Sequence, residues 1–342
     1  MSSFDVKIRP IRKLEDHPNA DRLDLATILG YRCVVAKGQH QEGDLVAYVP
    51  EDAILPEELL SHMGLEGKLA GKQKNRVKAV RLRGTLSQGV VIPLSLVTEL
   101  LERVPEEGED VAEALGIVKW DPPIPQQLQG VQRKRPGWFP TYTDLEHLKK
   151  FPDVLEEGEL VVITEKLHGA CMSAGYRKDE GFHVSSRRIN LVESEDNSYW
   201  RAARLYDLES RLQDLLTMLG ATSVVVYGEL LGVQDLKYGF DKDVGFKAFD
   251  VMVDGEYVDY VSAAYQVVTA VIGTVPILYT GPFSTQVVDE LVSGKSTIAD
   301  HIREGIVIRP LSEKIDSEIG GRVVMKVISE DYLTRRGGTE HR

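Results

Sequence analysis

A proline-rich break in the middle of the chain limits the fold more than any other feature. Residues 120–126 contain three prolines within four positions. Because proline fixes φ and lacks an N–H donor, neither a regular helix nor an inner strand can continue through this segment. The 342-residue chain is also long for a single hydrophobic core. We therefore predict two domains, 1–118 and 138–333, joined by a linker at 119–137 and followed by a disordered tail at 334–342.

Before the break, short apolar stretches alternate with turn-rich pieces, and no long helical pattern occurs. This alternation favours several short strands and a small β-barrel. The predicted strands cover 23–29, 32–36, 45–49, 77–82 and 89–92.

After the break, apolar strand patterns combine with a strong helical pattern. We predict buried strands at 160–164, 223–229, 244–253, 305–309 and 322–328. Between the first two, leucines recur at helical spacing from Leu205 to Leu219, and Gly220 follows as a helix stop. We interpret this stripe as core packing, and the mixture predicts an α+β domain.

The formal net charge of −12 argues against indiscriminate binding to polyanions. Local charge differs, because residues 68–83 carry seven basic side chains and no acidic one. A second basic cluster lies in the predicted linker. These residues either bind nucleic acid or form solvated loops that balance acidic helices. The candidate nucleic-acid-binding residues are Lys72, Lys74, Arg76, Lys78, Arg81, Arg83, Arg133, Lys134 and Arg135.

The composition also limits the cellular compartment in which the protein is expected. Cys33 and Cys171 are the only cysteines, which gives neither a disulfide framework nor a four-thiolate metal site. The N-terminus lacks the basic and apolar pattern of a secretory signal, and the apolar runs are too short for a membrane span. We expect a monomeric cytoplasmic protein without membrane contacts.

A few charged side chains interrupt the apolar strands of the second domain. Each would be costly there unless it is paired or bound to a ligand. A strand-end charge explains any one of them, but the ordered set favours an active site. It begins with the segment Lys166-Leu167-His168-Gly169 and continues with Arg187, Glu229, Asp250, Glu304 and Lys326.

This order resembles the motifs of the covalent nucleotidyltransferases, which comprise RNA ligases, DNA ligases and mRNA capping enzymes. The matching segments are Lys166–Gly169, Ser185–Arg187, Tyr227–Glu229, Ala248–Asp250, Glu304–Val307 and Val324–Lys326. The resemblance implies an ATP-grasp-like ligase domain with antiparallel sheets.

Two segments of the first domain resemble an OB-fold tRNA-binding module. They are His17–Leu23 and Arg83–Gly89. An OB-like barrel placed before the nucleotidyltransferase domain looks most like the Deinococcus-type RNA ligase.

The resemblance implies roles for individual residues. Lys166 would attack the α-phosphate of ATP, and Glu229 and Glu304 would bind Mg²⁺ or Mn²⁺, with a ribose hydroxyl as the alternative ligand of Glu229. Lys326 would hold the α-phosphate, assisted by Arg309 or Arg322. The other nucleotide contacts would come from Thr164, Glu165, His168, Gly169, Arg187, Phe246, Phe249, Ile306 and Val307.

Within this set, Phe249, or else Phe246, would stack on adenine, with Ile306 or Val307 as the opposite wall. The backbone at Thr164 and Glu165 would read the adenine edge. Arg187 would contact the ribose or the end being joined. Two positions depart from the family pattern: His168 stands where aspartate is commoner, and Val324 stands where a second lysine is frequent.

The leading functional hypothesis is an ATP-dependent RNA ligase that seals 3′-hydroxyl and 5′-phosphate ends in RNA repair. Its expected substrate is nicked duplex RNA or an RNA/DNA hybrid with RNA on the 3′-hydroxyl side. One alternative is a GTP-dependent capping guanylyltransferase, which is disfavoured because only sixteen residues follow Lys326, too few for a C-terminal barrel. The other alternative is a non-catalytic RNA-binding protein.

Overall fold

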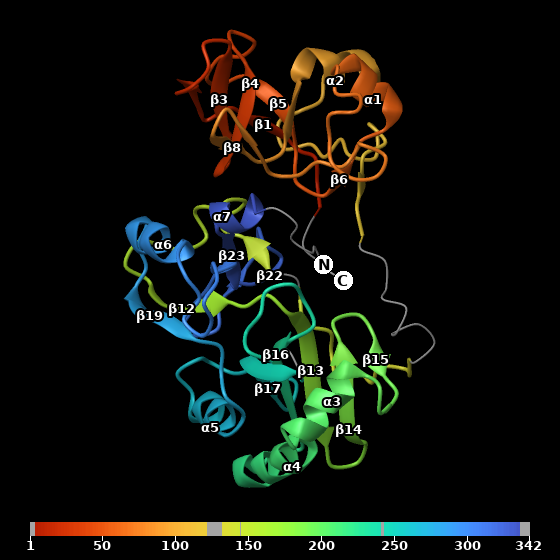
Figure 1. Cartoon of the computed structure of the whole chain (residues 1–342), viewed down its shortest axis with the longest axis vertical. Helices are drawn as coiled ribbons and strands as arrows, with labels where there is room; N and C mark the ends of the chain where they lie inside the picture. Colours follow the sequence, from red (N-terminus) through yellow and green to blue (C-terminus); the bar gives the residue numbers. More distant parts are fainter. Residues whose placement is uncertain (1–3, 122–131, 144, 241–242, 336–342) are drawn as a thin grey trace. The chain divides into compact units, whose positions relative to one another are not determined.

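The computed structural model describes residues 4–121, 132–143, 145–240 and 243–335. The chain divides into two compact units (Figure 1). The first comprises residues 1–122 and 146–152, and the second comprises 123–145 and 153–342. Most of the predicted linker and tail, at 122–131 and 336–342, lies outside the described residues.

The segment 146–152 belongs to the first unit, whereas the sequence had placed it in the second domain. The backbone N–H of Gly30 donates to the carbonyl of Lys149 at 2.8 Å, and Lys150 Nζ lies 2.8 Å from Asp5 Oδ2. These contacts are long-range, so local patterns could not have predicted them.

The first unit is built from short antiparallel ladders. One sheet has the order β1 (Ile8–Pro10), β5 (Leu45–Val49), β9 (Val90–Pro93), and another has the order β2 (Lys13–Asp16), β3 (Leu23–Ile28), β4 (Tyr31–Ala36). The remaining elements are the pairs β6 (Ala53–Ile54) with β10 (Val118–Lys119) and β7 (Val80–Leu82) with β8 (Thr85–Ser87), the strand β11 (Glu146–His147), and the helices α1 (Glu57–His62) and α2 (Leu94–Leu101). The predicted strands are present, but among the described residues of this unit the ladders do not close into a barrel.

The second unit contains a six-stranded antiparallel sheet. Its order is β15 (Asn190–Leu191), β14 (Gly181–Ser186), β13 (Ala170–Arg177), β16 (Ser223–Leu231), β17 (Gly245–Val253), β18 (Glu256–Tyr257). The pairing of β16 with β17 shifts register between Tyr227 and Gly228, so Tyr227 pairs with Asp250 while Glu229 pairs with Lys247, and the extra residue of this bulge is Phe249 on β17. The bulge changes which residues of β17 share a face with the predicted catalytic glutamate.

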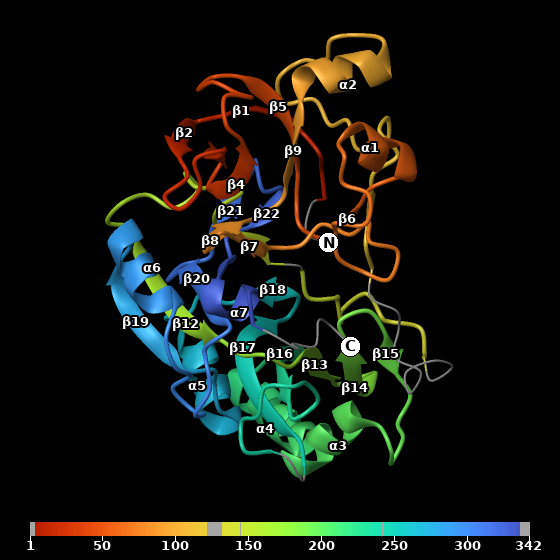
Figure 2. The ribbon, with the colours of Figure 1, turned by 45° about the horizontal axis from the view of Figure 1, so that its top comes forward.

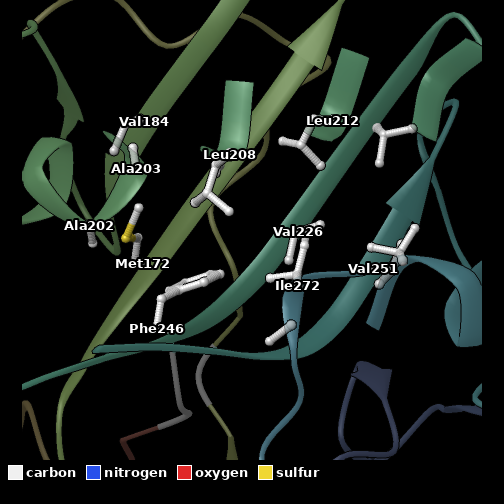
Figure 3. Packing of buried hydrophobic residues seen from close by; sticks show 14 of the residues in the cluster. Met172, Val184, Ala202, Ala203, Leu208, Leu212, Val226, Phe246, Val251 and Ile272 are labelled. Carbon is white, nitrogen blue, oxygen red and sulfur yellow. The ribbon is translucent and has the colours of Figure 1, made fainter. Parts of the chain in front are cut away.

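Helices cover one face of this sheet and build the main core. They are α3 (Ser198–Leu205), α4 (Leu208–Leu219) and α5 (Ala263–Ile272). Figure 3 shows Leu208 and Leu212 of α4 facing Val226 and Val251 of the sheet. Each such leucine contributes about 1.5–3 kcal/mol by burial.

The predicted leucine stripe is confirmed as core packing, with one difference at its start. The left-handed φ of 47° at Asp207 separates α3 from α4, and Leu205 is 54% exposed. Gly220 ends α4 with a φ of 65°, as the sequence predicted.

A second antiparallel sheet of this unit contains the order β23 (Met325–Ile328), β20 (Gly305–Pro310), β12 (Leu160–Lys166), β19 (Ile277–Pro282). Helix α6 (Thr285–Val292) packs against β20 (Figure 2). The hairpin β21 (Ile315–Asp316)–β22 (Gly321–Arg322) and helix α7 (Glu330–Leu333) complete the unit. Among the described residues, no helix is both long and apolar enough to cross a membrane.

Candidate functional site

Lys166, the last residue of β12, forms an ion pair with Glu304. Its Nζ lies 2.7 Å from Glu304 Oε1, and Lys166 is the cross-strand partner of Gly305. Burial alone would lower the pKa of the Lys166 amine, but the charges of Glu304 and Glu229 outweigh burial and raise it. Burial would raise the pKa of Glu304, but Lys166 and His168 lower it to about 2. The pair is therefore ionised in the protein without ligands.

Glu229, on β16, supplies a second carboxylate. The backbone N–H of Gly169 donates to its Oε1 at 2.8 Å, and burial raises the pKa of Glu229 to about 7, with a further contribution from Glu304. These interactions bring the Lys166–Gly169 segment, Glu229 and Glu304 together.

The two carboxylates suit a divalent cation bound with a phosphate. Glu304 Oε2 is buried and has no hydrogen-bond partner in the described structure, which leaves an oxygen available as a ligand. No group of three or more His, Cys, Asp or Glu among the described residues could hold a metal ion. Because Mg²⁺ accepts phosphate oxygens and water, one or two carboxylates are enough beside a nucleotide.

Two glycines of the predicted motifs allow close approach of the backbone at the site. An added Cβ would lie 2.2 Å from the Leu230 carbonyl oxygen at Gly169, and 2.1 Å from the Val327 carbonyl oxygen at Gly305. Any side chain at either position would push apart the segments that carry the charged residues.

The register of the second sheet places Lys326 near the Lys166 face. Val307 is the partner of Thr164 on β12 and of Lys326 on β23, while Lys166 is opposite Gly305. Since side chains alternate along a strand, Thr164, Lys166, Val307 and Lys326 share one face. The position of Lys326 is thus compatible with a role beside Lys166.

Two other predicted nucleotide contacts lie on the opposite face of this sheet. Ile306 is fully buried and cannot form an exposed wall, so Val307 is retained in its place. The Glu165 carboxylate accepts hydrogen bonds from Thr297, and the Glu165 N–H donates to the Pro276 carbonyl at 2.8 Å. The backbone N–H of Glu165 is therefore engaged and is not an adenine contact.

The two phenylalanines predicted to stack on adenine have different environments. Phe246 is fully buried in the core beneath the helices, so it has no face for a base, and we no longer assign it this role. Phe249 is half-buried, with its ring centroid 5.0 Å from that of Tyr142. Phe249 remains the candidate.

A buried charge network accounts for Asp250, Arg309 and Arg322. Asp250 is fully buried and accepts hydrogen bonds from Arg309 at 3.0 Å, from Arg322 at 2.8 Å and from the Tyr142 hydroxyl at 3.0 Å. Both arginines also bind Glu313. The guanidinium groups thus connect β17 to β20 and β22, which corrects the expectation that either assists Lys326 at the phosphate.

Arg187 follows β14 and is half-buried. Burial and the neighbouring Arg188 lower the pKa of Arg187, while Glu229 opposes this effect. The electrostatic coupling to Glu229 is consistent with a position near the nucleotide or the end being joined.

His168 is buried two residues after Lys166, and its partners were missed by the sequence reasoning. Its backbone N–H donates to the Tyr238 hydroxyl at 2.9 Å, and its ring contacts Asp235 and Tyr332. Asp235 and Tyr238 lie in an irregular loop after β16, where no pattern marked them.

The basic residues of the first unit do not all have the same environment. Lys72, Lys74, Arg81 and Arg83 are exposed, and Lys78 is half-buried. Arg76 is buried, donates from Nε to Asp52 at 3.1 Å and lies 3.4 Å from the centre of a Trp120 ring, so it is not available to a phosphate.

The two OB-like segments meet at the hairpin β7–β8. A ring nitrogen of His17 lies 3.1 Å from the Leu82 carbonyl oxygen, and the Asn19 side chain donates to the Arg83 carbonyl at 3.2 Å. These bonds fix the turn that presents Arg81 and Arg83.

The second basic cluster is mostly structural. Arg133 donates to the Phe182 carbonyl at 3.0 Å, and Arg135 donates to the Ser186 carbonyl at 3.2 Å. Burial lowers the pKa of both guanidinium groups. Lys134 is exposed, so it alone of the three remains a simple candidate for nucleic-acid contact.

Comparisons with known proteins agree with this arrangement. Residues 159–328 match a family model described as RNA ligase, and residues 5–94 match a model described as an OB-fold domain. No curated protein was found to be similar to the chain.

Among solved structures, the chain is similar to a Naegleria gruberi RNA ligase. A lysine-to-alanine mutant of that protein with ATP and Mn is 26% identical, with a TM-score of 0.79 over 96% of this chain and 98% of that one. A glutamate-to-alanine mutant with AMP and Mn is 26% identical, with a TM-score of 0.78 over 96% and 97%. The form with PPi is 27% identical, with a TM-score of 0.78 over the same shares.

Proposed function

Because this chain belongs to the RNA ligase family, with an OB-fold domain before its ligase domain, it is an ATP-dependent ligase, and we propose that it joins RNA ends through AMP bound covalently to Lys166. The observation that carries the proposal is the half-buried lysine at 2.7 Å from Glu304, with Glu229 at the same site. The Naegleria structures with ATP or AMP and Mn support this reading.

In the first step, Lys166 Nζ attacks the α-phosphorus of ATP. An N–P bond forms, the P–O bond to pyrophosphate breaks, and pyrophosphate leaves with the bonding electrons. The ammonium group must first lose a proton to solvent, because only the neutral amine is nucleophilic. Mg²⁺ or Mn²⁺ held by Glu229 and Glu304 would offset the carboxylate charge that keeps Lys166 protonated and would neutralise the phosphate oxygens.

The following steps transfer the nucleotide and join the ends. A 5′-phosphate oxygen attacks the lysyl-AMP phosphorus, which forms a phosphoanhydride and returns the electron pair to Lys166. A 3′-hydroxyl then attacks the activated 5′-phosphate, loses its proton, and expels AMP. Phe249 and Val307 would enclose adenine, Lys326 would hold the α-phosphate, and Arg187 would contact the ribose or the end being joined.

For the substrate, we propose nicked duplex RNA or an RNA/DNA hybrid with RNA at the 3′-hydroxyl, in a Deinococcus-type RNA repair ligase that acts as a cytoplasmic monomer. The domain order supports this assignment. Exposed basic residues would contact the phosphate backbone, which gives affinity without reading sequence. These residues are Lys72, Lys74, Arg81, Arg83 and Lys134.

The test is covalent labelling with ATP or GTP carrying a labelled α-phosphate, with Mg²⁺ or Mn²⁺. We expect label from ATP, its loss in Lys166→Ala, and its retention in Lys178→Ala, which removes an exposed lysine of the same unit. Lys166→Ala should still join a pre-adenylated nick. Label from GTP alone would support the capping alternative, and no label from either nucleotide would support the non-catalytic RNA-binding alternative.

A further inference from the structure

The imidazole of His168 is held on both sides by residues outside the predicted motifs. Nε2 lies 2.7 Å from Asp235 Oδ1, and Nδ1 lies 2.8 Å from the Tyr332 hydroxyl. The His168 side chain is only 6% exposed. With both nitrogens engaged in a buried position, the ring has little freedom to rotate.

The partners of His168 define the direction of the hydrogen bonds. A carboxylate can only accept, so the Nε2 proton of His168 is donated to Asp235. Asp235 therefore orients the ring with Nδ1 toward Tyr332 and Glu304, whose Oε2 lies 3.6 Å away. The other oxygen of Glu304 binds Lys166 at 2.7 Å. Hydrogen bonds thus connect Asp235, His168 and Tyr332, and the imidazole lies beside the carboxylate that pairs with Lys166.

Asp235 is itself fixed by the C-terminal end of the described structure. Arg335 Nη2 lies 3.4 Å from both carboxylate oxygens of Asp235, and its guanidinium stacks on the Tyr332 ring at 3.6 Å. Tyr332 belongs to α7, which follows the strand that carries Lys326. The network therefore joins helix α7, which directly follows the strand of Lys326, to the loop after Lys166.

The geometry of the network explains how histidine fits a position where aspartate is commoner. The imidazole reaches from the Lys166–Gly169 segment to the Asp235 carboxylate, so the acidic group beside this segment comes from the loop after β16.

We propose that Asp235 is a positioning residue that supplies the carboxylate missing from the Lys166–Gly169 segment and acts through His168 to hold this segment, and with it the Lys166 amine, in place. The inference rests on the proposed function, because its consequence is the rate of lysine adenylation. Residues that orient a directly acting group typically alter activity by about 10- to 100-fold.

The experiment compares Asp235→Asn with Asp179→Asn in the full-length protein. Asp179 also forms an ion pair with an arginine, Arg177 at 2.8 Å, but on an exposed turn. Lysyl-AMP formation is measured in single turnovers across ATP concentrations. We expect Asp235→Asn to slow the reaction at saturating ATP about 10-fold or more while the half-saturating ATP concentration changes less than about threefold. Asp179→Asn should match the wild type.

A double-mutant cycle with His168→Asn tests whether Asp235 acts through His168. If Asp235 acts through His168, adding Asp235→Asn to His168→Asn should change the rate by less than about twofold. Equal losses from Asp235→Asn with and without His168 would overturn the inference. A normal rate for the single variant would overturn it as well.

A folding defect is separated by a conservative variant. Asp235→Glu keeps the carboxylate and should be faster than Asp235→Asn at an equal folded fraction. Equal slowing by both substitutions would assign Asp235 a merely structural role and refute the proposal. Absence of label in the wild type would instead refute the proposed function, so the two failures are distinguishable.

Discussion

Replacement of Gly305 by alanine should displace Lys326 while leaving every charged residue of the site unchanged. The added Cβ would lie 2.1 Å from the Val327 carbonyl oxygen and 2.9 Å from the Ile328 Cα, whereas ordinary contact begins at 3.4 Å. Strand β23 must therefore move away from β20 by about 1.3 Å, the difference between contact and overlap. Val327 directly follows Lys326, so the lysine moves with the strand.

The displacement has different consequences for stability and for catalysis. Overpacking of this kind costs about 1–3 kcal/mol in free energy of unfolding. Displacement of a positioning group by about 1 Å can cost about 100-fold in rate. Gly305→Ala should thus remain folded at room temperature and lose about two orders of magnitude in lysine adenylation.

The assay is single-turnover formation of lysyl-AMP, with urea unfolding measured on the same preparations. Gly321→Ala is the matched control, since it also lies on a strand of this unit but an added Cβ meets nothing within 4 Å. The control should retain the wild-type rate. A Gly305→Ala protein that adenylates at the wild-type rate would refute the argument that backbone contact at this glycine positions Lys326.

Other predictions concern charge. Asp250→Ala should lower the free energy of unfolding in urea by about 3–5 kcal/mol, because two buried guanidinium groups lose their shared carboxylate. Burial raises the pKa of Glu229 to about 7 from an ordinary 4.5, so ionisation destabilises the fold as pH rises through this window, and metal-free Glu229→Gln should melt above the wild type near about pH 8 and converge with it near about pH 4. Combined Lys72→Ala and Lys74→Ala should weaken nick binding and lower its salt slope by about two, whereas Arg76→Ala should lower thermal stability without changing the slope.

The order of charged residues in apolar strands was sufficient to select three residues that the structure brings together. Lys166, Glu229 and Glu304 interact in the structure, and each has a position that the local pattern could indicate. A charged side chain at the buried end of a strand needs an oppositely charged or ligand partner. The sequence therefore predicts that such a partner exists, although it does not show which residue it is. The two-domain division and the core role of the leucine stripe follow from equally local signals.

Other parts of the site depend on long-range contacts. The bulge in β17 and the helices over one sheet face decide that Phe246 is buried while Phe249 is partly accessible. The sequence could not distinguish Arg76 and Arg309 from cations that are free to bind phosphate. The structure shows that each is paired with a carboxylate, Asp52 and Asp250 respectively. Asp235 had no periodic context, so its bond to His168 could only be found in three dimensions.

The path of the chain also shows that the first unit is not an independent N-terminal module. Residues 146–152 return to it after the chain has entered the second unit, so covalent connections between the units occur at three places. A truncation that removes 1–118 would leave this segment without the carboxylate of Asp5 and the N–H of Gly30. Its effect on adenylation would therefore combine loss of the proposed RNA contacts with disorder introduced fourteen residues before the nucleophile at 166. Substitution of exposed cations isolates the contribution to RNA binding, since it leaves all three connections in place.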